Sequence, residues 1–438
     1  MADRVTVIGW DGSPLTRAAT AALSAATLVA GAAHHLALAD VPRDAERIRL
    51  GSVDLAARCI AGHRGSAVVL ADGDPGFFGV VRTLRAPEHG LEVEVVPAVS
   101  SVATAFARAG MPWDDAQVVV AHPRTLRRAV NVCRAHHKVA VLTSPGAGPA
   151  ELALLLEGVH RTFVICEELG TARERVTVLT SDRAADHDWR DPNVVIVVGS
   201  GPTTASAGWI GGRDPARPDG VRGWALPEDA YRRTGNAPAG HAAAGYEPAG
   251  HAPAAHEPSV HDRSCTGQST EGESAGIRAA QLARLGPRTG DLVWDIGSGT
   301  GALAVEAARF GAAVIAVDRD PAACARATAA ARSFGVAVQV VQGLAPHVLE
   351  RLPEPDVVRI GSGGVPVALA VADRRPERIV THASTRDQAE ALVTALSGSG
   401  YTVECVLLQS VDLDTSDWEE RERSVAFLLC AVRSDLAP

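Results

Sequence analysis

The stretch LVWDIGSGTGALAVEAARFGAAVIAVD, residues 292–318, constrains the fold of this chain more than any other stretch. An apolar strand leads into Gly297, Gly299 and Gly301, an Ala-rich helix begins at Ala302, and a second strand ends on Asp318. Glycines let the backbone turn tightly and approach a ligand closely, and the helix points its N-terminus at that ligand. The pattern predicts a Rossmann-like unit that binds a nucleoside-bearing molecule.

Two ligand classes fit this loop, a dinucleotide and a methyl donor, and Asp295 bears on the choice. A pyrophosphate is doubly anionic, so a carboxylate just upstream of the loop would repel it. S-adenosylmethionine has no phosphate and carries a sulfonium and an ammonium group. Asp295 therefore favours S-adenosylmethionine, with Asp318 at its ribose, and a nicotinamide-dependent oxidoreductase is the alternative. Three later segments are expected at the same sheet edge. They are 340–346 along the adenine, the glycine-ended strand 356–364, and the polar stretch 381–390 at the end of another strand.

Residues 205–270 lack the hydrophobic periodicity of the sequence on either side. The centre of this region, NAPAGHAAAGYEPAGHAPAAHEPSVHD, is a degenerate repeat of Ala, Pro, Gly and His that cannot bury enough apolar surface to order itself. We expect a disordered linker here, and we expect its histidines to be solvated rather than metal-binding. They are His241, His251, His256 and His261.

On both sides of this linker, short apolar strands alternate with helical stretches such as 17–30 and 102–109. That alternation predicts two layered α/β domains, residues 1–204 and 271–438.

Composition and charge limit the partners of the chain. The 438 residues carry a formal charge of −9, which gives no global basic field for nucleic acid. The seven cysteines form no C-x-x-C pair, so neither a zinc site nor a disulfide framework is expected. The N-terminus shows no signal segment, and no apolar run approaches the about 18–20 residues that a membrane helix needs. We expect a cytoplasmic protein without membrane contact.

Several segments of the chain carry a family resemblance. VWDIGSGTGALAVEAARFGA, VDRDPAA, GLAPHVL and RIGSGG resemble the cobalamin-pathway methylase that acts on C-15 of precorrin-6 and decarboxylates an acetate side chain. VTVIGWDGSPLT, VVLADGDPGFFG, VVPAVSSVATAFARAGMPWDDAQVVVAH and CEELGTARERV resemble the C-5 methylases of the tetrapyrrole methylase family. Taken whole, the chain resembles the fused methyltransferases that act on precorrin-6Y at C-5 and C-15 in cobalamin biosynthesis.

The resemblance implies two folds and two donor sites. The first domain would have a two-subdomain tetrapyrrole methylase fold with S-adenosylmethionine in a cleft, and the second a class I methyltransferase fold. The residues implied for the first donor site are Gly9, Asp11, Gly12, Asp72, Gly73, Asp74, Pro75, Ser100, Ser101, Ala121 and His122. In the second domain, Gly343, Leu344 and Ala345 join the glycine loop, Asp295 and Asp318. Family members assemble, so a homo-oligomer is expected.

The implied substrate is a tetrapyrrole with many carboxylates, which Arg side chains near the clefts would bind. The expected substrate contacts are Arg82, Arg85, Arg124, Arg278, Gly363 and Gly364. Methyl transfer from a sulfonium needs alignment more than a strong base, so neither a catalytic triad nor a metal is expected, and no catalytic residue is assigned. Leu344 and the short glycine run at 361–364 depart from the family pattern. The alternative is a C-5 methylase whose second domain is degenerate.

Overall fold

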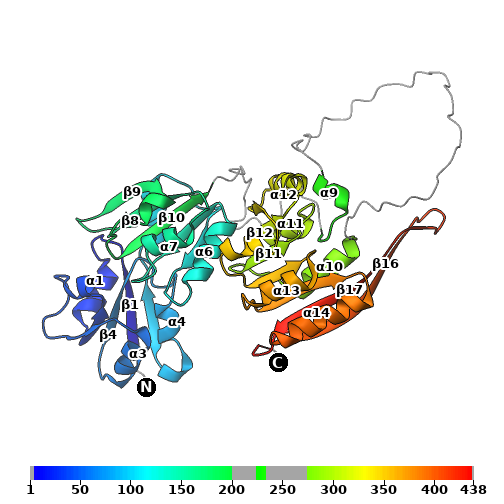
Figure 1. Ribbon diagram of the computed structural model, residues 1–438. Coiled ribbons are helices and arrows are strands. Elements are labelled where there is room, and N and C mark those ends of the chain that lie inside the picture. Colours follow the sequence, from blue (N-terminus) through cyan, green and yellow to red (C-terminus); the bar gives the residue numbers. More distant parts are fainter. Residues whose placement is uncertain (1–3, 200–222, 233–273, 437–438) are drawn as a thin grey trace, which may run out of the picture. The chain divides into compact units, whose positions relative to one another are not determined.

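A computed structural model describes residues 4–199, 223–232 and 274–436 of the chain. It divides into an N-terminal unit, Met1–Pro215, and a C-terminal unit, Ala216–Pro438 (Figure 1). The dividing point lies inside the predicted linker. The four linker histidines lie outside the described residues.

The first half of the N-terminal unit is a parallel five-stranded sheet in the order β3-β2-β4-β1-β5. Its strands are β1 (Arg4–Trp10), β2 (Leu28–Gly31), β3 (Glu46–Arg49), β4 (Ala67–Asp72) and β5 (Glu92–Val96). Its helices are α1 (Arg17–Ser24), α2 (Ala33–Leu36), α3 (Val53–Gly62), α4 (Val80–Leu84), the 3₁₀ turn η1 (Pro87–His89) and α5 (Ser101–Ala109). Apolar residues of β1, β2 and β4 are buried on both faces, as helices on both sides of a parallel sheet require.

One expectation fails in this half. Residues 17–30 were expected to be helical throughout, but α1 ends at Ser24 and Leu28–Gly31 forms β2. The Ala-rich sequence gave no sign of this break. The strand exists because Leu28, Val29 and Ala30 are buried between β3 and β4, a tertiary constraint that overrides local propensity.

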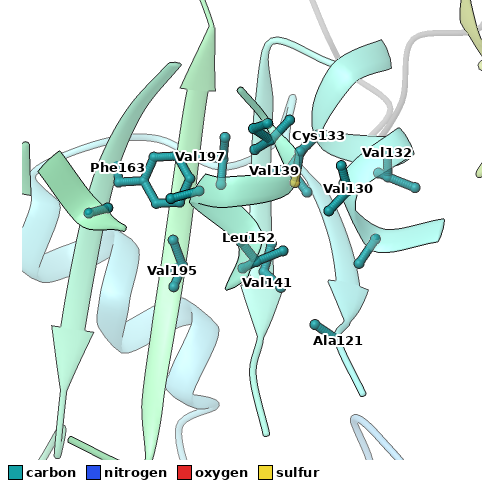
Figure 2. Packing of buried hydrophobic residues seen from close by; sticks show 14 of the residues in the cluster. Ala121, Val130, Val132, Cys133, Val139, Val141, Leu152, Phe163, Val195 and Val197 are labelled. Atoms are coloured by element: carbon teal, nitrogen blue, oxygen red, sulfur yellow. The ribbon is translucent and has the colours of Figure 1, made fainter. Parts of the chain in front are cut away.

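The second half of the N-terminal unit is a mixed sheet in the order β6-β7-β10-β8-β9. Its elements are β6 (Gln117–Val120), α6 (Leu126–Ala135), β7 (Lys138–Leu142), α7 (Pro149–Leu155), β8 (Arg161–Glu167), β9 (Arg175–Thr180), α8 (Ser181–Ala184) and β10 (Asn193–Gly199). Figure 2 shows the buried cluster in which Val139 and Val141 of β7 and Phe163 of β8 pack with Cys133 and Leu152 from the helices. Burial raises the pKa of the Cys133 thiol to about 12, so this cysteine acts as a core residue.

The C-terminal unit contains a seven-stranded sheet in the order β13-β12-β11-β14-β15-β17-β16. Its strands are β11 (Leu292–Ile296), β12 (Ala313–Asp318), β13 (Gln339–Gln342), β14 (Val357–Ile360), β15 (Arg378–Ala383), β16 (Tyr401–Leu413) and β17 (Glu420–Arg433). Its helices are α9 (Glu228–Arg232), α10 (Ala275–Leu285), α11 (Ala302–Arg309), α12 (Pro321–Ser333), the 3₁₀ turn η2 (His347–Arg351), α13 (Gly364–Ala372) and α14 (Arg386–Gly398). The first five strands are parallel to one another, and β17 is antiparallel to both of its neighbours, β15 and β16. The carboxyl ends of β11, β12, β13 and β14 therefore meet at one edge.

Residues 223–232 pack on the C-terminal unit, although the sequence placed them in the linker. Leu226 and Tyr231 join a buried cluster with residues of α11 and α12. The Tyr231 hydroxyl donates to Glu306, and Trp224 stacks on Phe310 with ring centroids 3.9 Å apart. Part of the predicted linker therefore belongs to the core of this unit.

Among the described residues, no helix is both long and apolar enough to span a bilayer.

Candidate functional site

The loops after β1, β4 and β5 converge in the N-terminal unit. A Cβ at Gly9 would lie 2.3 Å from the Gly73 carbonyl oxygen, and one at Gly73 would lie 2.7 Å from the Ser101 amide nitrogen. The Gly73 amide donates to the Trp10 carbonyl over 2.7 Å. The structure thus brings Gly9, Gly73 and Ser101 together at one sheet edge, and backbone contacts this close leave room only for glycine.

Asp11 ties this edge together through its carboxylate. Oδ1 accepts from the Ser13 amide at 2.9 Å, and Oδ2 accepts from the Val99 amide at 3.2 Å. Burial alone would raise the pKa of Asp11, but these hydrogen bonds outweigh burial and lower it. Next to it, Gly12 approaches Gly170 from the second half so closely that a Cβ at Gly12 would lie 2.0 Å from the Gly170 carbonyl oxygen.

Asp72, at the end of β4, is held by two histidines that the sequence analysis did not single out. Its Oδ1 lies 2.8 Å from His34 Nε2 and 3.0 Å from His35 Nε2. Burial opposes ionisation of Asp72, yet the hydrogen bonds from both imidazoles lower its pKa well below the ordinary range. The bond to Asp72 in turn raises the pKa of His34, against the opposing effect of burial.

These three side chains are close enough to be considered as metal ligands, since their ligand atoms lie within 4.8 Å of one another. However, the Ala32 amide donates to His35 Nδ1 at 3.2 Å, which leaves the proton of the neutral ring on Nε2, the atom that faces Asp72. A metal would need that nitrogen unprotonated. The cluster therefore fits a hydrogen-bonded support of Asp72 better than a metal centre.

The remaining residues expected at the first donor site differ in their surroundings. Asp74 Oδ1 accepts from the Gly76 amide at 2.9 Å and so closes the turn around Pro75, while Ser100 caps α5 by accepting from the Ala103 amide at 3.1 Å. Ala121 is buried and His122 is exposed at the end of β6, in the second sheet.

The arginines expected to bind substrate in this unit are exposed. They are Arg82, Arg85 and Arg124. Arg85 donates to the Val93 carbonyl at 3.2 Å. The three positions stay predictions.

In the C-terminal unit the glycine loop lies at the carboxyl ends of β11 and β12. Gly297, Gly299 and Gly301 all have positive φ angles, of 68°, 57° and 75°. The Gly299 amide donates to Asp318 Oδ2 at 2.9 Å, and the Asp320 amide donates to Asp318 Oδ1 at 3.0 Å. Asp318 thereby shapes the loop, and a Cβ at Gly299 would point into open space beside it. The strand, loop and helix expected from the sequence are confirmed.

Asp295 is fully buried and faces Arg359 of the neighbouring strand β14. Arg359 Nη1 lies 3.1 Å from Asp295 Oδ1 and 3.1 Å from the Gly297 carbonyl oxygen. The charge of Asp295 is thus balanced inside the sheet. A ligand at the loop therefore does not meet an open carboxylate at Asp295, as the expected attraction of a sulfonium would require.

The other segments expected at this edge also lie there. The Gly343 amide donates to the Asp318 carbonyl at 2.9 Å, Leu344 is 55% exposed, and Ala345 precedes a cis proline. Gly361 donates to the Ile296 carbonyl, and Gly363 and Gly364 begin α13 with positive φ angles.

Arg278 is 1% exposed, unlike the other arginines expected to bind substrate. Its guanidinium donates to the Leu226 carbonyl, pairs with Glu228 at 3.3 Å and lies 5.0 Å from the Tyr231 ring centroid. The buried charge of Arg278 therefore anchors residues 223–232 instead of facing a substrate carboxylate.

A cavity of about 310 Å³ opens beside the glycine loop, at the carboxyl ends of β14 and β15. Its polar walls come from Ser362, His382, Ser384 and Gln388, and Gly361 and Gly364 complete this edge. Sequence reasoning expected Gly364 and the polar stretch 381–390 at this edge, but it did not single out His382 and it missed the partner of His382, Gln281. The sequence did carry part of the signal for such a partner. Arg359 is a charged residue in an otherwise apolar strand and so requires buried polar partners.

Two family models match the chain, and together they cover both units. Residues 10–185 match the tetrapyrrole (corrin/porphyrin) methylases, and residues 267–412 match a precorrin methyltransferase domain. A precorrin-6Y C(5,15)-methyltransferase (decarboxylating) of Sinorhizobium is 34% identical over 84% of this chain and 78% of its own length. The chain belongs to this family.

Other members and relatives agree with that assignment. A precorrin-6Y C(5,15)-methyltransferase of Mycobacterium tuberculosis is 29% identical over 90% of each chain. A cobalt-precorrin-7 C(5)-methyltransferase of Salmonella typhimurium is 36% identical and covers 42% of this chain and 92% of its own length. Both family models and these relatives therefore place a tetrapyrrole methylase domain before a second precorrin methyltransferase domain in this chain.

Proposed function

We propose that this chain methylates a precorrin-6 intermediate at C-5 and C-15 and decarboxylates its C-12 acetate side chain in cobalamin biosynthesis. The N-terminal unit would carry out the C-5 methylation, and the C-terminal unit the C-15 methylation with decarboxylation. The observation that carries this proposal is the presence of two separate glycine-built sheet edges in a chain that matches the precorrin-6Y family along most of its length.

We further propose one S-adenosylmethionine site in each unit. In the N-terminal unit the donor would bind where Gly9, Gly73 and Ser101 come together. A Cβ at either glycine would collide with backbone there. In the C-terminal unit Gly299 offers open space beside Asp318, whose carboxylate could also meet ribose hydroxyls. When bound, the donor supplies an electrophilic methyl group on a good leaving group. The residues around it have only to align an electron-rich ring carbon.

Product mass spectrometry tests this function directly. Full-length protein with donor and a precorrin-6 substrate should add two methyl groups and release one molecule of CO₂. Gly9→Ala should leave out the C-5 methyl group only, and Gly301→Ala should leave out the C-15 methyl group. Loss of both products in either variant would refute the division of labour between the units.

C-5 methylation alone is the second candidate, because Leu344 departs from the family pattern and is exposed where the adenine is expected. The same assay separates the candidates, since a degenerate C-terminal unit would add one methyl group and release no CO₂. We also propose a homo-oligomer, which light scattering of the purified chain would test.

A further inference from the structure

The cavity beside the glycine loop contains one ionisable group. Among the described residues that line it, His382 alone has a side chain that can change its charge; the others are glycines, hydroxyl or amide residues and apolar residues. At about 310 Å³ the cavity is smaller than a tetrapyrrole macrocycle, so it suits one edge of the ring with one side chain. No Arg or Lys is among these lining residues.

His382 is held in one neutral form by a chain of buried side chains. Arg359 offers only donors, and its Nε donates to Gln281 Oε1 at 3.0 Å. The amide of the fully buried Gln281 is therefore oriented with its nitrogen toward His382 Nδ1, 3.2 Å away. Nδ1 then accepts, and the single proton of the neutral ring resides on Nε2. A second proton on Nδ1 would face an N–H donor, so this arrangement opposes the cationic form.

A neutral donor suits the loss of a carboxyl group. The carboxylate charge disappears as CO₂ forms, so a cation beside it would stabilise the ground state more than the transition state and slow the reaction. A neutral N–H orients the carboxylate but stabilises its negative charge less than a cation would. The many other carboxylates of the substrate are better bound by cations elsewhere.

We propose that His382 is a catalytic residue that binds the carboxyl group to be lost through Nε2–H, and that Gln281 is the positioning residue that keeps it neutral. This inference rests on the proposed function. The bond between the methylene carbon and the carboxylate breaks, its electron pair enters the conjugated macrocycle, and CO₂ leaves. Solvent then supplies one proton to the methylene carbon, which becomes a methyl group. His382 keeps its proton throughout.

The test measures CO₂ release by the full-length protein, with C-5 methylation in the same sample as an internal control. His382→Ala should slow CO₂ release about tenfold or more, because the carboxylate loses the hydrogen bond that aligns its breaking bond with the macrocycle. His382→Asn retains an N–H donor and should keep more activity than His382→Ala. Both variants should bind S-adenosylmethionine as the wild type does, which shows that they are folded.

Gln281→Glu tests the neutral state, because a carboxylate facing Nδ1 would favour a cationic imidazole. We expect the pKa of His382, followed by NMR with labelled histidine, to rise, and CO₂ release to become slow at low pH and to recover as the pH increases. An unchanged rate in His382→Ala, or an unchanged pH profile in Gln281→Glu, would overturn the inference while leaving the proposed function intact. Absence of CO₂ release from the wild type would instead refute the proposed function, and the inference with it.

Discussion

The two units build ligand-binding edges from glycine in different ways. In the N-terminal unit, the glycines permit close backbone contacts between loops, as at Gly9 against Gly73 and at Gly12 against Gly170. In the C-terminal unit, side-chain carboxylates also hold the glycine loop, because Asp318 accepts hydrogen bonds from the Gly299 and Asp320 amides. Both edges exclude a Cβ at some of their glycines, but only the C-terminal edge depends on charged side chains as well.

Adding a Cβ at Gly9 should have the largest effect. Gly9→Ala places a carbon 2.3 Å from the Gly73 carbonyl oxygen and 2.9 Å from the Ala98 amide nitrogen, so the loops must separate. We expect C-5 methylation to be lost and C-15 methylation to be retained, as measured by product mass. Gly51→Ala is the matched control, because a Cβ there meets nothing within 4 Å, and it should retain both activities.

Removing Arg359 should destabilise the C-terminal unit next most strongly. Arg359→Met leaves the fully buried Asp295 without its ionic partner, which costs about 3–5 kcal/mol. Calorimetric unfolding should show one of two transitions moved to lower temperature. The double variant Asp295→Leu with Arg359→Met removes both charges and should recover much of the loss; an additive loss would show that the pair is not coupled.

The Tyr231 hydroxyl offers a smaller perturbation of the same unit. Tyr231→Phe takes a donor from the buried Glu306, and burial with that contact raises the pKa of Tyr231, so the hydroxyl stays protonated and donating. We expect a loss of about 1–3 kcal/mol in the free energy of unfolding of the C-terminal unit. A fragment of residues 216–438 should likewise be more stable than one of residues 271–438. Equal stability of the two fragments would mean that residues 223–232 contribute nothing to this core.

The pH dependence of the His34–Asp72 pair should be the smallest effect, because both side chains are more than one-third exposed. The pKa of His34 is raised in the folded state. The stability that protonated His34 contributes is therefore full below its unfolded-state pKa and is lost as the pH rises through its folded-state pKa. The pKa of Asp72 is lowered in the folded state. The stability that ionised Asp72 contributes is therefore present above its unfolded-state pKa and is lost as the pH falls through its folded-state pKa. The N-terminal unit should therefore lose some thermal stability as the pH rises above neutrality. Asp72→Asn should flatten that slope, and the exposed His160→Asn should leave it unchanged.

Much of this architecture could be predicted from the sequence. The strand, glycine loop and helix at 292–310 follow from short-range chemistry, and the turn at Asp74 and Pro75 likewise needs only local residues. The break at Leu28 could not be predicted, because burial between β3 and β4 creates that strand. The packing of residues 223–232 could not be predicted either, because Tyr231 contacts Arg278 and Glu306, which lie far from it in the chain.

The donor sites were predicted as sets of residues, but not how they are held. Asp295 was identified by position, whereas its pairing with Arg359 depends on the register of β11 against β14. His34 and His35 of α2 support Asp72 at the end of β4, a contact that no local pattern reveals. Long-range pairing therefore accounts for most of what the sequence left out.

Donor stoichiometry tests the central claim of two independent donor sites most directly. Isothermal titration of the full-length chain with S-adenosylmethionine should give two equivalents bound per chain. Gly9→Ala and Gly301→Ala should each retain one equivalent. The Cβ added at Gly301 would lie 2.6 Å from the Ala327 Cβ. A single equivalent in the wild type, or loss of both equivalents in either variant, would contradict the account.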